Sequence, residues 1–470
     1  MVNKYLCVHG HFYQPPRFDP FTGRMPLERG AEPFHDFNEK IDAESYRPNA
    51  IAGNFQRLSF DVGPTLATWL ETNDPETYRL ILDADRQHRE NFGHGNAMAQ
   101  AYNHTILPLA NGNEKRIQIA WGIADFRHRF GREPEGLWLA ETAVDYETLC
   151  LLVSRGIKYT ILAPWQAASG IDTSEPYRVF TCDGESIVIF FFDRTLSAMV
   201  SFDDQETVNA DVFASQVLPQ RVNWEKIRQG KPELTLIASD GEAYGHHKQD
   251  RDKFLQYLLT VSAPREGYEV VALASYFHAH PPIQEVHVTD DTSWSCFHGV
   301  RRWEDKDEEA GDQNDWKKRL RTAFNRLAER IDAAYAKTAS RFLNDPWEIL
   351  EHYVQVKLGE KTIREMLATY NARTDSREGT ALASMMECQY YRQLMFTSCG
   401  FFFEDLDRIE PYNNLAFAAR AIELAKAAGF DDIEGTFLDD LQLATSWRTG
   451  RTAREIYLSI LERRQQARGE

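Results

Sequence analysis

The alternation of short apolar runs with amphipathic stretches over the first 290 residues constrains the fold of this chain more than any other feature. The runs "KYLCVHG", "EGLWLAET", "IKYTILAP", "SIVIFFFD" and "LTLIASDGE" have the length of buried strands, and "YEVVALASYF" indicates a strand that turns into a helix. The stretch "YETLCLLVSRG" has helical spacing. Strand–helix alternation of this kind predicts an α/β fold with a parallel sheet or barrel.

Polar residues stand where several of these runs end. His9, His11, Glu141, Asp193 and Asp240 each lie at or just after the predicted C-terminal end of a strand. In parallel sheets and barrels this edge carries the active site. The sequence therefore predicts a reaction site that these five residues help to form.

Two of these residues are carboxylates from different strands, Glu141 and Asp240. Such a pair suits hydrolysis of an acetal, with a gap of about 5–5.5 Å for a retaining mechanism and about 6.5–9.5 Å for an inverting one. The alternative is that both residues cap the helices that follow their strands, because strand-to-helix turns favour Asp and Glu.

The stretch "HGHFYQPPR" places His9 and His11 on one face of a continuing strand. They could bind a metal or the hydroxyl groups of a sugar, or they could be structural histidines whose hydrogen bonds are satisfied. A zinc site needs at least three ligands, and the sequence offers no obvious matching Asp or Cys set. We therefore predict no metal here.

Three further stretches hold candidate site residues or structural residues. In "GNAMAQAYNHTILPLA", Gln100 and His104 are substrate donors or belong to a helix N-terminus. In "TSWSCFHGVRRWED", Trp294 and His298 are unusual for a linker. In "FTSCGFFFEDL", Phe401 either stacks on a sugar or anchors a helical domain.

From about residue 310 onward the spacing is helical almost throughout. Long helices are predicted in "DWKKRLRTAFNRLAERIDAAYAKTASRFL", "NLAFAARAIELAKAAG" and "TAREIYLSILERRQQARGE". The acidic segment "EDKDEEAGDQND", residues 304–315, is expected to be an exposed loop. We expect a catalytic barrel at 1–290, a linker near the active site at 291–315, and an all-helical domain at 316–470 that closes the cleft.

Composition indicates which kinds of partner the protein binds and in which cellular compartment it works. A formal net charge of −18 repels phosphate backbones, so a neutral substrate is expected rather than nucleic acid. Every apolar run is shorter than the ~18 residues that span a bilayer, and "MVNKYLCVHGHF" does not resemble a signal peptide. The six cysteines are scattered and form no CxxC pair. We therefore expect a cytoplasmic protein with free thiols and no disulfide framework.

Five motifs in order resemble those of glycoside hydrolase family 57. "HFYQPP" is similar to the first motif, "AYNHTILPL" to the second, "GLWLAET" to the third, "SDGEAYGHH" to the fourth and "FTSCGFFFEDL" to the fifth. The chain departs from the family pattern in the Phe12–Tyr13 insertion before Gln14, in Ser239 where several members have Asp, and in Phe401 where Trp is common. The C-terminal half resembles a subgroup with domain of unknown function 3536.

The resemblance implies an incomplete parallel (β/α)7 barrel followed by a helical domain, with no cofactor. It implies Glu141 as the nucleophile and Asp240 as the general acid/base of a retaining enzyme. We expect Glu242 and His246 to help keep the pKa of Asp240 high, although His246 could also be part of a solvated helix start. The expected substrate-binding residues are His9, His11, Gln14, His104, Trp138, Asp193, Glu242, His246, Trp294, His298 and Phe401.

The resemblance implies a hydrolase or 4-α-glucanotransferase that acts on the α-1,4 or α-1,6 linkages of α-glucans. A metal-dependent carbohydrate enzyme of the α-mannosidase or deacetylase type is a second hypothesis, and His9 and His11 motivate it. A catalytically silent glucan-binding protein is a third. The sequence leaves linkage, chain length and oligomeric state open.

Overall fold

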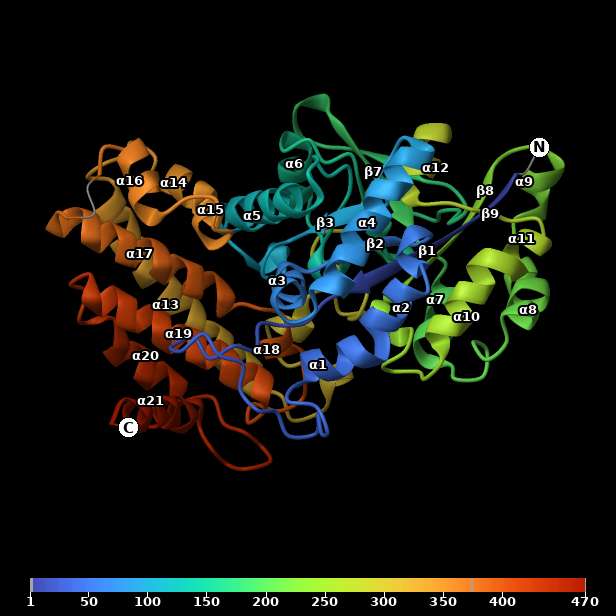
Figure 1. The fold of residues 1–470 in the computed structure, drawn as a ribbon. Coiled ribbons are helices and arrows are strands. Elements are labelled where there is room, and N and C mark those ends of the chain that lie inside the picture. The colour runs from blue at the N-terminus through green and yellow to red at the C-terminus, as the bar shows by residue number, and fades with distance from the viewer. Residues whose placement is uncertain (1–2, 373–374, 470) are drawn as a thin grey trace. The chain divides into compact units, whose positions relative to one another are not determined.

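The computed structural model describes residues 3–372 and 375–469, and Figure 1 traces them from β1 to α21. The strands are β1 (Lys4–Phe12), β2 (Ser59–Val62), β3 (Ala97–Gln100), β4 (Leu137–Trp138), β5 (Tyr159–Leu162), β6 (Tyr177–Phe180), β7 (Ser186–Phe191), β8 (Glu233–Asp240), β9 (Glu269–Val270) and β10 (Gln284–Glu285).

The α-helices fall into an earlier and a later set. The earlier set is α1 (Phe37–Ile41), α2 (Arg47–Ile51), α3 (Pro64–Asn73), α4 (Pro75–Phe92), α5 (Gly112–Phe130), α6 (Tyr146–Ser154), α7 (Arg194–Phe202), α8 (Ala210–Val212), α9 (Trp224–Arg228), α10 (Arg251–Tyr257), α11 (Ala263–Arg265) and α12 (Leu273–Ala279). The later set is α13 (Trp316–Ala339), α14 (Pro346–His352), α15 (Val354–Lys357), α16 (Ile363–Thr369), α17 (Arg377–Leu394), α18 (Cys399–Phe402), α19 (Ile409–Ala427), α20 (Ile433–Leu441) and α21 (Ala453–Gly469).

Parallel strands form the incomplete barrel that the family resemblance implied. β1 pairs with β2 and β8, β2 with β3, β3 with β4, and β5 with β7, all in parallel. Gly136, just before β4, forms a parallel bridge with Tyr159 of β5. In the described part of the chain β7 and β8 have no ladder between them, although the Asp193 N–H donates to the Leu236 carbonyl over 2.7 Å. The barrel is therefore interrupted between β7 and β8.

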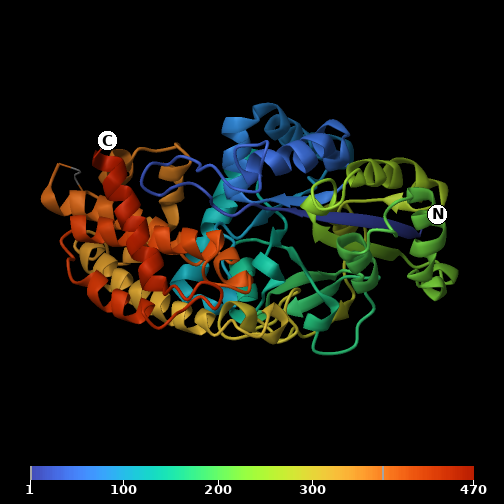
Figure 2. The ribbon, with the colours of Figure 1, turned by 90° about the horizontal axis from the view of Figure 1, so that it is seen from below.

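The barrel core explains where the polar strand ends point. Cys7 of β1 and Leu234, Leu236 and Ala238 of β8 lie in one buried cluster. Because alternate residues of a strand share a face, the next residue of this series on β8 is Asp240. The same alternation continues from Cys7 to His9 and His11 on β1. In Figure 2 the blue helices α1 to α4 lie on one side of the dark-blue β1.

Contact clustering divides the chain into two compact units. The barrel unit comprises Met1–Gln14, Leu27–Ala101 and Phe126–Trp294, and the helical unit comprises Pro15–Pro26, Tyr102–Asp125 and Ser295–Glu470. Two early segments thus group with the late helices. The expected boundaries at 290 and 316 would instead assign both segments to the first domain. These boundaries stay a prediction.

The long helices of the helical unit pack around a continuous apolar core. α13 contacts α17 and α20, α17 contacts α19, and α19 contacts α21. Phe324 lies at the centre, with ring contacts to Phe396, Phe401 and Phe437. The all-helical prediction for this part of the chain is confirmed.

One expectation from the sequence is wrong. Cys150 and Cys182 form a disulfide, with Cα atoms 5.5 Å apart, because α6 and the turn after β6 bring them together. The acidic segment 304–315 is largely an exposed loop as expected, but Asp307 and Asn314 within it are fully buried. None of the described helices combines the length and apolar character that crossing a bilayer requires.

Candidate active site

Strand register gathers polar side chains at the C-terminal edge of the barrel. His11 of β1 pairs with Asp61 of β2 on one side and with Asp240 of β8 on the other. Gln100, the last residue of β3, pairs with Trp138, the last residue of β4. The predicted site residues His11, Trp138 and Asp240 therefore meet at one edge, and Asp61 joins them.

A buried carboxylate holds the two histidines of the first motif. Asp61 is fully buried, and its two oxygens contact His9 Nε2 at 3.1 Å and His11 Nδ1 at 2.8 Å. Burial lowers the pKa of His9. Burial also acts to lower the pKa of His11, but the charges of Asp61, Asp240 and Glu242 outweigh it and raise this pKa to about 9. At neutral pH His11 is a cation among carboxyl groups.

Two tryptophans line this edge. The Trp138 ring stacks on both histidines, with centroids 4.9 Å from His9 and 4.9 Å from His11. Trp294 meets Trp138 edge-on at 5.0 Å. Within the described residues, the Trp138 indole Nε1 and both polar atoms of the Gln100 side chain are buried without a hydrogen-bond partner. These atoms are available to a polar ligand.

Glu141 is held in an unusual conformation. It follows β4 with φ 56°, and Thr142 follows with φ 50°, a region that non-glycine residues rarely occupy. The Trp294 indole N–H donates to Glu141 Oε2 at 2.9 Å, and the Trp294 main-chain N–H donates to the Glu141 carbonyl at 3.0 Å. Backbone strain of this kind clusters at functional sites, where the surrounding structure maintains it.

Asp240 ends β8 beside the buried His11 and Asp61; the residue as a whole is exposed to solvent, while its carboxyl group is desolvated. Its desolvated surroundings raise its pKa to about 6; the negative charges of Glu141 and Asp61 add to the rise, and His11 opposes it. Burial and the charge of Asp240 likewise raise the pKa of Glu242, to about 7. The two carboxyl groups interact, so the expectation that Glu242 helps keep the pKa of Asp240 high stays a prediction.

Glu242 is buried in a hydrogen-bond network. The Tyr46 hydroxyl, the Tyr13 main-chain N–H and the Gln14 side-chain amide all donate to its Oε1 atom, the last two at 3.3 and 3.4 Å. Gln14, which follows the Phe12–Tyr13 insertion, thus reaches the same group as Glu242. His246 binds Glu44 through Nδ1 at 2.5 Å, and its expected influence on Asp240 stays a prediction.

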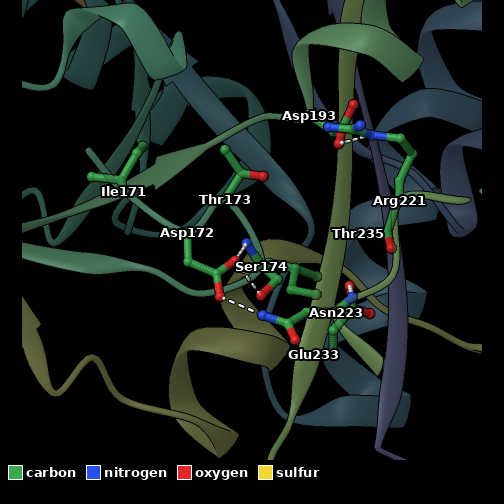
Figure 3. Close-up of a pocket in the computed structure, with 10 residues that line it drawn as sticks. Ile171, Asp172, Thr173, Ser174, Asp193, Arg221, Asn223, Glu233 and Thr235 are labelled. Carbon is green, nitrogen blue, oxygen red and sulfur yellow. Dashed lines mark hydrogen bonds and ion pairs between the residues drawn. The ribbon is translucent and has the colours of Figure 1, made fainter. Parts of the chain in front are cut away.

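Asp193 has structural partners at the interruption of the barrel. It caps α7 by accepting from the Leu196 N–H at 2.9 Å, and Arg221 Nε donates to its other oxygen at 2.8 Å. Figure 3 shows this pair at one end of a cavity of about 320 Å³ that Glu233 also lines. The neighbours of Asp193 differ from those of Asp240. The expected contact between Asp193 and the substrate stays a prediction.

The remaining candidates belong to the helical unit. His104 has φ 53°, and its Nδ1 atom lies 2.6 Å from the Ser398 hydroxyl. His298 binds Asp307 at 2.8 Å. Phe401 is fully buried against Phe324, which fits the hydrophobic anchor and leaves no ring face exposed for stacking on a sugar.

Sequence reasoning missed Asp61 and Tyr46. Asp61 lies in the short run "SFDV" before a Gly–Pro turn, and Tyr46 ends a π-helical turn at Asp42–Tyr46. Two groups of described residues place three or more ligand-type atoms close enough for a metal ion, and neither includes His9 or His11. The metal-dependent hypothesis stays a prediction, and neither group contains the residues that motivated it.

Residues 41–289 match the family described as glycosyl hydrolase family 57, and residues 313–467 match a domain of unknown function. The chain is 26% identical over 186 residues to alpha-amylase 1 of Dictyoglomus thermophilum, which covers 38% of this chain and 24% of that protein. It is 26% identical over 173 residues to the 4-alpha-glucanotransferase of Thermococcus litoralis, which covers 35% and 25%. The matches span about a quarter of these relatives.

Solved structures resemble the chain along nearly its whole length. An exo-type maltose-forming amylase from Pyrococcus sp. ST04 has a TM-score of 0.74 at 16% identity and covers 97% of this chain and 88% of its own. A branching enzyme from Pyrococcus horikoshii has a TM-score of 0.62 at 16% identity and covers 98% and 94%. At these identities the likeness establishes the fold alone.

Proposed function

This chain belongs to glycosyl hydrolase family 57, and from that membership we propose that it cleaves α-glucosidic bonds of α-glucans with retention, as a hydrolase or a 4-α-glucanotransferase. The relatives named alpha-amylase and 4-alpha-glucanotransferase support this substrate class. The formal charge of −18 favours a neutral saccharide over nucleic acid or an anionic membrane. We propose that the protein is cytoplasmic, because four of the six cysteines are free thiols. A cytoplasmic location does not explain the Cys150–Cys182 disulfide.

The observation that carries this proposal is the unequal environment of two neighbouring carboxyl groups. Glu141 is held by Trp294 and acts as a negative charge on Asp240. Desolvation together with that charge raises the pKa of Asp240 to about 6. A pair of carboxyl groups whose environments differ in this way suits one nucleophile and one proton donor.

In the proposed first step, a Glu141 oxygen attacks the anomeric carbon and the bond from that carbon to the glycosidic oxygen breaks. Asp240 gives its proton to the departing oxygen, and a glycosyl ester of Glu141 remains. In the second step, Asp240 takes a proton from water or from a sugar 4-hydroxyl, whose oxygen displaces Glu141. Water gives hydrolysis, and a sugar gives transfer.

The other groups at this edge bind and orient the sugar in this proposal. The unpartnered Trp138 Nε1 atom and Gln100 amide suit sugar hydroxyl groups, which both donate and accept hydrogen bonds. The imidazolium of His11 offsets the negative charge near Asp240. Because Asp240 must carry a proton to act as an acid, kcat/KM is expected to fall as pH rises through about 6.

The test compares Glu141→Gln and Asp240→Asn with the wild type on maltoheptaose and on an α-glucoside whose aryl leaving group needs little protonation. Glu141→Gln should lose both activities. Asp240→Asn should lose roughly 10²–10⁴-fold on maltoheptaose and much less on the first step with the aryl glucoside. Glu225→Gln, at a side chain that is 61% exposed, is the matched control and should leave both rates unchanged.

Chromatography of the maltoheptaose products separates the two activities. A ladder of shorter and longer oligosaccharides means transfer, and shorter products alone mean hydrolysis. Unchanged turnover in both site variants, with each variant folded by circular dichroism, overturns the proposed roles. Glucan binding without turnover by the wild type over a panel of α-glucans overturns the enzymatic proposal in favour of a binding protein.

A further inference from the structure

The segment after Trp294, which sequence analysis singled out and the proposed reaction does not use, gathers four metal-ligating side chains. Cys296 and His298 come from one turn, and Asp307 and Glu309 come from the start of the acidic segment. One ligand atom from each of the four lies within 4.8 Å of the others. All four residues belong to the helical unit.

The spacing of these atoms is close to that of a zinc coordination shell. Zinc bonds of about 2.0–2.3 Å in a tetrahedron place neighbouring ligand atoms about 3.3–3.6 Å apart. Cys296 Sγ lies 3.3 Å from Asp307 Oδ2, and His298 Nδ1 lies 3.7 Å from Glu309 Oε1. His298 Nδ1 is closer to Asp307 Oδ1, at 2.8 Å, as expected for a hydrogen-bonded pair.

The loop that carries the carboxylates is fixed by its own hydrogen bonds. Asn314 accepts from the Asp307 N–H at 3.0 Å and donates to the Asp307 carbonyl at 2.7 Å and to the Gly311 carbonyl at 2.8 Å. Asp307 and Cys296 are buried, whereas the His298 side chain is 44% exposed. Two of the four side chains are therefore buried, and the group opens to solvent at His298.

We propose that Cys296, His298, Asp307 and Glu309 bind one Zn²⁺ ion as a structural site. A cysteine thiolate, a histidine and two carboxylates are ligands that zinc takes, and four protein ligands close a structural site. The thiol releases its proton to solvent when the sulfur–zinc bond forms.

Charge supports this assignment. The thiolate and two carboxylates carry three negative charges, the ion brings two positive ones, and the Arg302 guanidinium supplies the third. Arg302 Nε lies 3.6 Å from Asp307 Oδ2, and its terminal nitrogen lies 3.7 Å from Glu309 Oε2. Within the described residues, the buried Arg302 Nε has no hydrogen-bond partner. Ligating carboxylates are usually held by partners outside the coordination shell, and Arg302 lies in such a position.

A second group of possible ligands, His94, Glu135 and His278, lies in the barrel unit and differs in one respect. The Lys158 ammonium already binds Glu135 at 2.8 Å, on the oxygen that His278 contacts. An ion there would lie beside a cation that already neutralises the only carboxylate of the group. The second group therefore serves as the control for adventitious binding through histidine.

The test measures zinc in the full-length protein by mass spectrometry after purification without added metal and after exposure to zinc followed by dialysis. The wild type should hold about one equivalent. Cys296→Ser and His298→Ala should each weaken zinc more than roughly 100-fold, beyond the range for outer-sphere partners. Cys399→Ser and His94→Ala should retain wild-type affinity. Because His298→Ala removes a partner of the buried Asp307, circular dichroism must show that this variant is folded, and the conservative Cys296→Ser tests the site independently.

Cobalt gives a readout that depends on the sulfur ligand. Co²⁺ added to the metal-free protein should produce a thiolate-to-cobalt charge-transfer band that Cys296→Ser abolishes and Cys399→Ser keeps. Two outcomes overturn the proposal: no stoichiometric zinc in the folded wild type, or zinc that persists in His298→Ala and disappears in His94→Ala. Neither outcome depends on glucan turnover, so this test and that of the proposed function fail independently.

Discussion

Asp61 and the two histidines of β1 form a unit in which each member stabilises the others. Asp61 is fully buried, so its charge depends on the donors at 3.1 and 2.8 Å. Removing one partner of a buried charged pair leaves an uncompensated charge, which typically costs about 3–5 kcal/mol. His9 and His11 thus have a structural role that does not depend on any contact they make with a sugar.

Glu242 gives a prediction about stability. Burial first, and then the charge of Asp240, raise its pKa from 4.5 to about 7. The folded protein therefore holds this proton more tightly than the unfolded chain, and folding stability falls as pH rises from about 4.5 to about 7. Glu242→Gln removes the charge and keeps an oxygen for the Tyr46 hydroxyl. It should raise the free energy of unfolding by on the order of 1–3 kcal/mol near pH 8 and by nothing near pH 4.

Urea unfolding of wild type and variant at the two pH values measures this difference. Glu225→Gln is the control, because that exposed carboxylate has its pKa lowered by Arg228 and should show no such gain at high pH. A gain for Glu242→Gln of equal size at both pH values would mean that packing, not charge, sets the effect.

The residues found from sequence were those whose neighbours in the chain identify them. Glu141 and Asp240 directly follow apolar runs and sit in motifs, so their place at the strand ends could be predicted. Asp61 contacts a residue 50 positions earlier, and no local pattern encodes that contact. The contact of Tyr46 with Glu242 is even harder to predict, because 196 positions separate the two residues in the chain.

At the element scale, the close approach of β1 and β8 requires a glycine after Asp240. A Cβ atom on Gly241 would lie 2.3 Å from two atoms of the Phe12 ring, which packs in the core beside Phe55. Gly241→Ala should therefore lower the free energy of unfolding by about 1–3 kcal/mol and reduce kcat/KM, since β8 must shift at the residue next to Asp240. Thermal unfolding and steady-state kinetics measure the two effects.

Two further variants show whether the clash is the cause. Phe12→Leu in the Gly241→Ala background should recover part of the loss, because the smaller side chain frees the space. Gly170→Ala is the matched control, as a Cβ atom there meets nothing within 4 Å. Equal losses in Gly241→Ala and Gly170→Ala would contradict the steric account.

Element length decided which parts of the barrel could be predicted. β1 and β8, with nine and eight residues, stand out as apolar runs. β2 and β3 have four residues each, so their hydrophobic signal is too short to separate from noise. β4 has only two residues and is predicted from the longer apolar run that contains it. β6 pairs antiparallel with β7, an arrangement that strand–helix alternation does not signal.

At the scale of the whole molecule, one feature could be predicted from the sequence and another could not. The net charge of −18 is read directly from composition. The membership of Pro15–Pro26 and Tyr102–Asp125 in the helical unit could not be predicted, because it depends on contacts with residues far along the chain. The net charge therefore supports a prediction about how salt affects the reaction rate, and this prediction does not depend on how particular helices or strands pack.

A strongly acidic protein repels anions and has no long-range attraction for an uncharged sugar. For neutral maltoheptaose, kcat/KM should change less than about twofold when salt rises from about 0.02 M to about 0.5 M, since screening removes a field that the substrate does not feel. A maltooligosaccharide that carries a carboxylate at its reducing end should react slowly at low salt and gain several-fold as salt rises. Initial rates across a salt series measure both. A steep fall in kcat/KM for the neutral sugar would mean that salt disrupts the active site itself. Equal kcat/KM values for the two sugars at low salt would mean that the net charge of the protein does not affect substrate binding at the site.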